Sequence, residues 1–378
     1  MERGMDMNET KEQPLPVSFE EWESRARGVL AKGPFDYIAG GAGAEETIRR
    51  NREAFRSWRI QPFMLRDVST RDARVTLFGQ TFPAPILLAP LSIQGIAHPQ
   101  GELASARAAA ALGVPFTIST VSSRPLEEVA AAMGRAPRWF QFFWPNAPDV
   151  AASLLRRAEA AGYSAVVVTL DLPVYGWRER DVRNAYNPFL KGEGIANFVT
   201  DPVFRSKLKK PPEEDWNAAI ALFGSMFFHP GLTWRDLPFL RRHTRLPFLL
   251  KGILQPRDAE LAVQHGADGI IVSNHGGRQV DGEVAALDVL PDIIDIVRGR
   301  IPVLMDSGVR GGADVIKAIA LGATAVLIGR PYIYGLAVAG EEGVRRVIEN
   351  LLTDLHLTMA NCGIRSLAEL NRSLLTRR

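Results

Sequence analysis

The chain has 378 residues, 46% of them hydrophobic, so it can bury a large core and fits either one α/β barrel or two ordinary domains. Lysine and arginine total 45 against 42 acidic residues, and no basic block is interleaved with aromatic residues, which excludes nucleic acid as a partner. The single cysteine, Cys362, excludes an internal disulfide and a cysteine metal cluster, and we interpret it as a structural thiol.

The N-terminal segment predicts a helix and no membrane-targeting signal. The first residues, MERGMDMNETKEQPLP, contain no apolar core of signal-peptide length, and no later apolar run of about 18 residues escapes interruption by charge. We therefore expect a cytoplasmic protein without a membrane span. Ser18 and Glu21 have the spacing of a capping box, and Gly33-Pro34 is expected to end the helix that they begin. The glycine-rich stretch 35–43 is not a dinucleotide site, because no strand precedes it and Glu46 replaces the last glycine.

From residue 85 onward, short apolar runs alternate with alanine-rich stretches of helical character. Helices are expected at Glu102–Leu112, Ala147–Ala161, Asp258–His265 and Gly312–Leu321. Eight such strand and helix units predict a closed (β/α)8 TIM barrel. The eight expected strands are Ile86–Ala89, Pro115–Ile118, Arg138–Phe142, Ala165–Leu170, Pro247–Leu250, Gly269–Val272, Ile301–Met305 and Thr324–Ile328.

The fourth and fifth strands are separated by far more chain than one helix requires. This stretch contains glycines, prolines and a charge cluster, a composition that favours a mobile lid over the site instead of a second domain. We therefore expect residues 1–378 to form one domain, with an N-terminal helical extension (1–84), a lid insertion (180–235) and a C-terminal helical tail (340–378).

Each expected strand is followed by polar residues or glycines at the end where such barrels carry their active sites. So many polar strand ends favour a functional site over a set of caps and turns. In chain order they are Ser92, Ser119, Gln141, Thr169 with Asp171, Lys251, Ser273 with His275, Asp306 with Arg310, and Gly329 with Arg330.

The sixth strand leads into Ser273-Asn274-His275-Gly276-Gly277-Arg278-Gln279. A neutral imidazole accepts a proton and a guanidinium binds a carboxylate through two parallel hydrogen bonds, so His275 and Arg278 suit proton removal from a carboxylic acid. The alternative is that both residues end the strand for structural reasons.

The loops after the last two strands, DSGVRGG at 306–312 and IGRP at 328–331, combine glycines with arginines. Exposed backbone amides and positive charge at this place in a barrel predict a phosphate site, although each motif alone also fits plain turn chemistry. Together with Lys251, these loops suggest a phosphorylated cofactor with an electron-rich ring.

Several motifs together resemble one family, the FMN-dependent α-hydroxy acid oxidases and dehydrogenases. The resemblance covers nearly the whole chain, and the stretch from GWRERD to NPFLKGEGIANFVTDPVF is more similar to the lactate oxidase and lactate 2-monooxygenase branch than to plant-type glycolate oxidases. The motifs are FDY around Tyr37, APLSIQG (89–95), FQFF (140–143), TLDLPVYGWRERD (169–181), LLKG (249–252), IIVSNHGGRQ (270–279), MDSGVRGG (305–312) and IGRP (328–331).

The resemblance implies a role for each catalytic residue. His275 would be the base, oriented and charge-supported by Asp171, while Arg178 and Arg278 bind the substrate carboxylate with help from Tyr37. Lys251 would stabilise negative charge on reduced FMN. The remaining residues implied to contact FMN are Pro90, Leu91, Ser92, Ser119, Gln141, Thr169, Ser273, Asp306, Gly308, Arg310, Gly329 and Arg330.

One residue departs from the family pattern. Members usually have a tyrosine whose hydroxyl contacts the substrate where this chain has Phe143. Phe143 would keep the ring at the substrate site and remove the hydrogen-bond donor, which bears on substrate identity and catalytic rate.

The leading hypothesis is an FMN enzyme that oxidises a small L-2-hydroxy acid, such as lactate, to the 2-oxo acid and is reoxidised by oxygen or another acceptor. Alternatives are oxidative decarboxylation of the lactate 2-monooxygenase type, a quinone-linked dehydrogenase for a larger acid such as mandelate, another FMN barrel such as a type 2 isopentenyl diphosphate isomerase, and a catalytically silent FMN-binding barrel. The histidines lack metal-ligand spacing, so we expect no metal. The resemblance implies a homotetramer or larger assembly.

Overall fold

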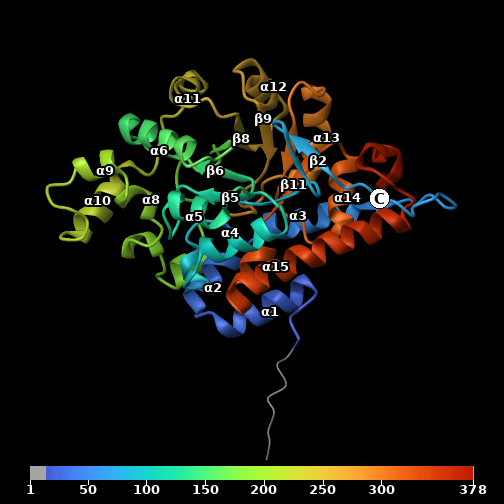
Figure 1. Ribbon diagram of the computed structural model, residues 1–378, viewed down its shortest axis with the longest axis horizontal. Coiled ribbons are helices and arrows are strands. Elements are labelled where there is room, and N and C mark those ends of the chain that lie inside the picture. The colour runs from blue at the N-terminus through green and yellow to red at the C-terminus, as the bar shows by residue number, and fades with distance from the viewer. Residues whose placement is uncertain (1–13, 378) are drawn as a thin grey trace, which may run out of the picture.

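The computed structural model describes residues 14–377, and within them eight parallel strands close into a barrel in the order β10-β11-β4-β5-β6-β7-β8-β9 (Figure 1). The predicted (β/α)8 fold is therefore confirmed. The strands are β4 (Ile86–Leu88), β5 (Phe116–Ser119), β6 (Arg138–Phe142), β7 (Val166–Thr169), β8 (Phe248–Ile253), β9 (Gly269–Val272), β10 (Val303–Met305) and β11 (Ala325–Ile328).

The barrel strands form because their short apolar runs are buried on both faces, as parallel strands require. Every residue of β4, β7 and β9 is buried. Alternate side chains, among them Leu87, Trp139 and Ile271, fill the barrel interior. Six strands lie within their predicted ranges, while β5 and β8 continue beyond theirs.

Strand β8 is longer than predicted because a bulge at Gly252 lets the chain continue pairing through Ile253. Gly252 has a φ of +106°, and a β-carbon at this position would lie 2.7 Å from the β-carbon of Asp171. The bulge therefore needs glycine, and it allows the end of β7 to approach Lys251 closely.

Helices surround the barrel and follow its strands. The last of them, α15, has non-helical backbone at Ala339 and Gly340, so the predicted C-terminal tail starts at a break within the helix. This tail ends in β12 (Leu375–Arg377), which pairs antiparallel with β1 (Trp58–Ile60), so it is not helical throughout. The α-helices that follow the other barrel strands are α4 (Glu102–Ala111), α5 (Leu126–Met133), α6 (Pro148–Ala160), α12 (Pro256–Gln264), α13 (Ala286–Val297), α14 (Gly312–Ala320) and α15 (Arg330–Asn361).

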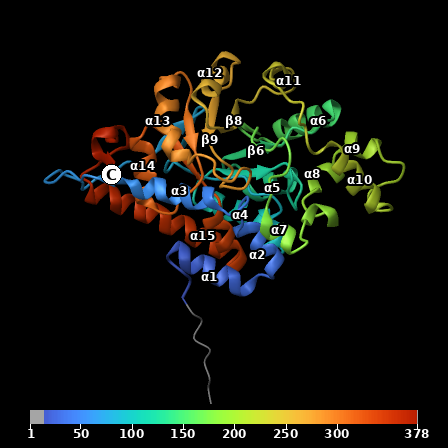
Figure 2. The ribbon, with the colours of Figure 1, turned by 180° about the vertical axis from the view of Figure 1, so that it is seen from behind.

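The N-terminal extension contains α1 (Phe19–Val29), α2 (Lys32–Ala39) and α3 (Glu46–Ser57), and α1 lies beside α15 in both views (Figures 1 and 2). The capping box of Ser18 and Glu21 is present. The prediction that Gly33-Pro34 ends the first helix is wrong. The helix ends at Val29, and both residues lie in the first turn of α2, where the missing N–H of proline costs little. The prediction for residues 1–13 lies outside the described residues.

The insertion between β7 and β8 is helical, and its outer helices form one end of the molecule (Figures 1 and 2). It buries its own aromatic cluster, including Phe198, Phe204 and Phe223, which explains why it is folded instead of an irregular loop. Its role as a lid stays a prediction. The helices of the β7–β8 connection are α7 (Glu179–Arg183), η2 (Pro188–Lys191), α8 (Ala196–Val199), α9 (Pro202–Ser206), α10 (Trp216–Met226), η3 (Trp234–Asp236) and α11 (Pro238–His243).

No helix in residues 14–377 is both long enough and apolar enough to cross a membrane.

The hairpin of β2 (Val75–Leu77) and β3 (Gln80–Phe82) packs against the side chains of the barrel interior, with Leu77 and Phe82 buried. We expect Phe82→Ala to lower the free energy of unfolding by about 3–5 kcal/mol, because it leaves a cavity in this cluster. Thr81→Ala on the exposed face of the same strand is the control and should change it by less than about 0.5 kcal/mol. Equal effects in denaturant titrations would show that the hairpin does not complete the core.

Candidate active site

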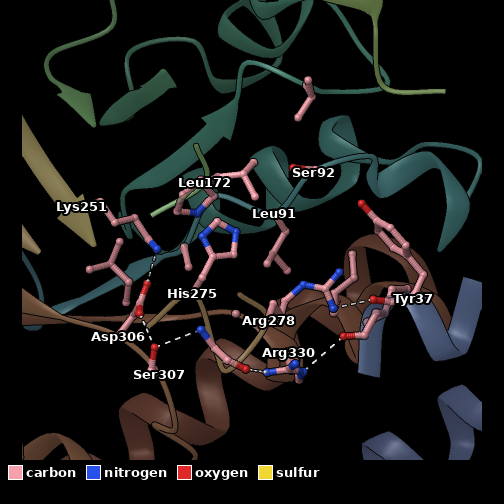
Figure 3. Close-up of a pocket in the computed structure, with 18 of the residues that line it drawn as sticks. Tyr37, Leu91, Ser92, Leu172, Lys251, His275, Arg278, Asp306, Ser307 and Arg330 are labelled. Atoms are coloured by element: carbon pink, nitrogen blue, oxygen red, sulfur yellow. Dashed lines mark hydrogen bonds and ion pairs between the residues drawn. The ribbon is translucent and has the colours of Figure 1, made fainter. Parts of the chain in front are cut away.

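A cavity opens at the carboxyl ends of the barrel strands (Figure 3). It is bounded by the strand-end loops, by α2 and by the insertion. Fourteen residues predicted from the sequence line it: Tyr37, Pro90, Leu91, Ser92, Phe143, Arg178, Lys251, His275, Arg278, Asp306, Gly308, Arg310, Gly329 and Arg330.

At the centre of the cavity, His275 is held by Asp171. The Nδ1 atom of His275 lies 2.8 Å from Oδ1 of Asp171, which leaves Nε2 as the other ring nitrogen. Burial and the charge of Lys251 lower the pKa of His275 below its ordinary value, against the opposing effect of Asp171. Burial alone would raise the pKa of Asp171, but the charges of His275 and Lys251 lower it. The resting pair is therefore a neutral imidazole beside a carboxylate, the state that a general base requires.

Lys251 lies beneath this pair in a buried polar cluster. Its Nζ donates to Ser273 Oγ at 2.8 Å and lies 3.2 Å from Asp306 Oδ2 and 4.0 Å from Asp171 Oδ2. Although burial opposes the charge, Asp306 and Asp171 raise the pKa of Lys251 above its ordinary value. A fixed ammonium group therefore lies at the cavity wall, where it can stabilise negative charge on a bound group.

Two further cations come from the insertion and from the loop after β9. Arg278 donates to the backbone carbonyls of Tyr37 and Gly40 at 2.6 and 2.7 Å through one nitrogen, Nη1. Arg178 donates to the carbonyl of Arg278 and to the side chain of Gln279. These contacts fix both guanidinium groups at the cavity, and burial with the charge of Arg178 lowers the pKa of Arg278 to about 10, so it stays protonated at neutral pH.

Arg310 and Arg330 are a second pair of cations at the cavity, and both are half-buried. Arg330 donates to the carbonyls of Ile38, Gly276 and Gly40. Burial and the charge of Arg330 lower the pKa of Arg310 to about 9. Within residues 14–377, Arg178, Arg278, Arg310 and Arg330 make no ion pair with a carboxylate. Buried charges normally have partners, so this set of cations is suited to anionic ligands.

The other predicted residues lie just behind the cavity wall. Ser119 donates to the side-chain carbonyl of Gln141, whose amide donates to Thr169, both at 2.8 Å. Ser92 lies 3.3 Å from Ser119 and connects this chain to the cavity lining. The hydroxyl of Ser273 accepts the hydrogen bond from Lys251 described above. The structure therefore brings all the predicted residues together. Five of them do not line the cavity themselves: Ser119, Gln141, Thr169, Asp171 and Ser273.

Sequence reasoning missed several residues of the site. Tyr175, whose hydroxyl lies 3.5 Å from that of Tyr37, could have been found because it stands between Asp171 and Arg178 in one motif. The hydroxyl of Ser307 accepts a hydrogen bond from the backbone N–H of Gly276 at 3.1 Å, and Ser307 lies in the predicted phosphate loop. Glu283 does not line the cavity, although its carboxyl lies near enough to Asp171 to feel that charge, and nothing in the sequence pointed to it. Its Oε2 has no hydrogen-bond partner among the described residues, and burial and the charge of Asp171 raise its pKa to about 7.

The side of the cavity opposite Tyr37 is apolar. Phe143, Leu172 and Phe227 line it, and the ring of Phe143 stacks at 6.4 Å from the ring of His275. Phe227 comes from the end of the insertion and meets Phe143 edge to face at 5.5 Å. The cavity therefore has one cationic side and one aromatic side, with the imidazole between them.

The residues present fit a flavin phosphate. Arg310, Arg330 and the glycine-containing loops at 306–312 and 328–331 would hold the phosphate, and Lys251 would lie beside the electron-accepting ring system. Gly276, whose carbonyl accepts from Arg330, has a φ of +65°, a backbone conformation that favours glycine. No cluster of three or more potential metal ligands from His, Cys, Asp and Glu occurs in the part of the chain that the structure describes.

Comparison with known proteins gives the same cofactor. The chain is 46% identical to an L-lactate oxidase of Lysinibacillus sphaericus, over 95% of this chain and 92% of that protein. It is 41% identical to human 2-hydroxyacid oxidase 1, with 96% of both chains covered. The crystal structure of a mandelate oxidase superposes with a TM-score of 0.85 at 40% identity, covering 96% of this chain and 98% of that one. Residues 26–377 match the FMN-dependent dehydrogenases, and the chain is therefore a member of that FMN-using enzyme family.

Proposed function

We propose that this protein oxidises an L-2-hydroxy acid to the corresponding 2-oxo acid, with His275 as the base and Arg178 and Arg278 as the carboxylate clamp. The observation that carries the proposal is His275, which is paired with Asp171 and lines one cavity with two guanidinium groups that make no ion pair with a carboxylate among residues 14–377. The names of the relatives, lactate oxidase and 2-hydroxyacid oxidase, support the same class of substrate.

The residues divide the reaction between them. Arg178 and Arg278 hold the substrate carboxylate, since Arg278 uses only Nη1 for backbone contacts. The hydroxyl of Tyr37, near that of Tyr175, adds a donor on the same side. The substrate's 2-hydroxyl and α-carbon then lie at His275, whose Nε2 takes the proton of the hydroxyl group while the α-hydrogen leaves with the two electrons of its bond to carbon. FMN, when bound, supplies the acceptor for the two electrons that leave the α-carbon.

Asp171 and Lys251 stabilise the charges that develop during the reaction. As His275 takes up a proton, the carboxylate of Asp171 at 2.8 Å stabilises the imidazolium. Lys251 stays protonated next to Asp306 and compensates negative charge that accumulates on the cofactor side. A type 2 isopentenyl diphosphate isomerase would need no such carboxylate clamp, so this constellation favours the hydroxy acid.

The electron acceptor is proposed to be oxygen, on the strength of the oxidase names among the relatives. Decarboxylation of the product within the site and transfer to a quinone are the alternatives. We also keep the proposals of a homo-oligomer and of a cytoplasmic location, the latter supported by a single buried cysteine.

Purified protein is expected to contain FMN, and Arg330→Met should weaken FMN binding by about 1.5–3 kcal/mol, because it removes charged hydrogen-bond donors from the anion site. The flavin-to-protein ratio after gel filtration measures this effect. Arg346→Met on the exposed part of α15 is the matched control and should retain FMN fully. Equal retention by both variants would remove Arg330 from the phosphate site.

The pH dependence of kcat/KM should report His275. Neutral imidazole is the reactive form, so kcat/KM should fall as the pH drops through a pKa below about 6.5. Because Asp171 raises that pKa, Asp171→Asn should move the acid limb to lower pH while it slows the reaction.

His275→Gln tests the same role with the cofactor in place. It should reduce the rate of anaerobic flavin bleaching by roughly 10²–10⁴-fold while FMN stays bound, because the amide cannot accept the proton. Near-normal bleaching by this variant would assign the base elsewhere.

Arg278→Lys should lower kcat/KM by about 1.5–3 kcal/mol, since lysine keeps the charge but loses the planar, two-point contact with a carboxylate. Steady-state kinetics on the best 2-hydroxy acid would measure it. An unchanged kcat/KM would mean that Arg278 only supports the backbone of α2.

A further inference from the structure

The loop between β4 and the short helix η1 (Gln94–Ile96) forms one wall of the cavity that contains His275. The lining residues of this wall are Ala89, Pro90, Leu91 and Ser92 (Figure 3). They lie outside any helix or strand, and the next residue, Ile93, has a φ of +56°, which is unfavourable for a β-branched side chain. The shape of the wall therefore depends on contacts from behind it.

A buried chain of hydrogen bonds lies behind the wall. The hydroxyl of Tyr332 donates to the backbone carbonyl of Ala89 at 2.8 Å, and the side-chain amide of Gln94 donates to the same hydroxyl at 3.2 Å. Ser105 donates to the side-chain carbonyl of Gln94 at 2.6 Å. Because an amide nitrogen can only donate, the hydroxyl proton of Tyr332 points to Ala89. Tyr332, Gln94 and Ser105 are fully buried, so water cannot replace a hydrogen bond that is lost.

A buried carboxyl group anchors this chain of hydrogen bonds. Glu102, which is also fully buried, accepts through Oε1 the backbone N–H groups of Gln94 at 3.0 Å and Ser123 at 2.9 Å. Ser123 lies two residues after Val121, which lines the cavity as well. The network therefore fixes the loops that follow β4 and β5 relative to α4 and α15.

Tyr332 shares a helical turn with a cation of the predicted phosphate site. It follows Arg330 by two residues in the first turn of α15. Arg330 lines the cavity, whereas Tyr332 does not. One turn of helix therefore carries both a guanidinium group for the phosphate and the hydroxyl that holds the wall at Ala89.

We propose that Tyr332 is a positioning residue for the oxidation, because its hydroxyl fixes the wall of residues 89–92, three of which are expected to contact FMN. The inference rests on the proposed function. Loss of the hydroxyl leaves the carbonyl of Ala89 and the amide of Gln94 without their partner, and the wall then relaxes relative to His275. The phosphate site and the carboxylate clamp keep all their residues.

Tyr332→Phe removes one oxygen atom and tests the proposal in the holoenzyme. We expect FMN to stay bound, but the visible absorption spectrum of the oxidised flavin should change. The limiting rate of anaerobic flavin reduction by the best 2-hydroxy acid should fall by roughly 10–100-fold, because a small misplacement of reacting groups has effects of this size. The substrate concentration at half-saturation should change by less than about twofold, since Arg178 and Arg278 are held by other segments.

Tyr163→Phe is the matched control. Tyr163 is buried, and its hydroxyl donates to the backbone carbonyl of Leu126 at 2.8 Å, but neither residue lines the cavity. This variant should lower the midpoint of thermal unfolding about as much as Tyr332→Phe does, because each loses one buried hydrogen bond to a carbonyl. Its flavin spectrum and its limiting rate of reduction should match those of the wild type.

Gln94→Leu removes the second partner of the Tyr332 hydroxyl. It should change the flavin spectrum and slow the reduction as Tyr332→Phe does, and the two effects should not add in the double variant, because both act through one chain of hydrogen bonds. Additive effects would contradict that single chain.

An unchanged spectrum and limiting rate in Tyr332→Phe, or an equal loss in Tyr163→Phe, would overturn the positioning role and leave the proposed function intact. If no 2-hydroxy acid reduces the wild-type flavin, the proposed function fails. The flavin spectra of Tyr332→Phe and Tyr163→Phe, which need no turnover, then still decide whether the Tyr332 hydroxyl shapes the FMN site.

Discussion

The buried ammonium of Lys251 is the interaction on which the site depends. It lies between Asp171 and Asp306, two carboxylates that follow different strands, and it donates to Ser273 on a third. Such a group is costly to bury alone, and the cluster is stable because each charge faces an opposite one. It holds the ends of β7, β8, β9 and β10 in one arrangement, which fixes Asp171 and through it the ring of His275.

The same cluster explains why His275, the proposed base, is neutral. Asp171 is shared between a cation that stays charged and an imidazole whose burial lowers its pKa. The positive charge of Lys251 disfavours a second positive charge on His275 at rest. The carboxylate of Asp171 stabilises the imidazolium that forms when His275 accepts a proton. The carboxylate of Asp171 therefore serves both Lys251, whose charge it stabilises, and His275, whose ring it orients. The bulge at Gly252 is the backbone feature that allows Lys251 to approach this carboxylate.

Much of the barrel could be predicted from the sequence, because strands that are buried on both faces have to be short apolar runs. The residues after them, such as Lys251, His275 and Arg310, could be located for the same reason: strand ends converge at one face. Contacts between distant segments could not. The packing of Phe143 and Leu172 beside Phe227 depends on where the β7–β8 insertion lies relative to the barrel. The composition of the insertion, with its glycines, prolines and charges, suggested a loop, although its buried phenylalanines stabilise helices. The prediction that Gly33-Pro34 ends the first helix failed because proline also suits the first turn of a helix, here α2.

In the proposed function, the cationic side of the cavity fixes the substrate carboxylate and the aromatic side faces the substituent, with His275 between them. The most direct test of this account is the rate of anaerobic flavin reduction in a single turnover, with a 2-hydroxy acid carrying hydrogen or deuterium at the α-carbon. The account predicts complete flavin reduction, slowed by deuterium, because the α-carbon bond breaks while the substrate is held at His275. Failure of the flavin to be reduced, or reduction at the same rate with both isotopes, would contradict it.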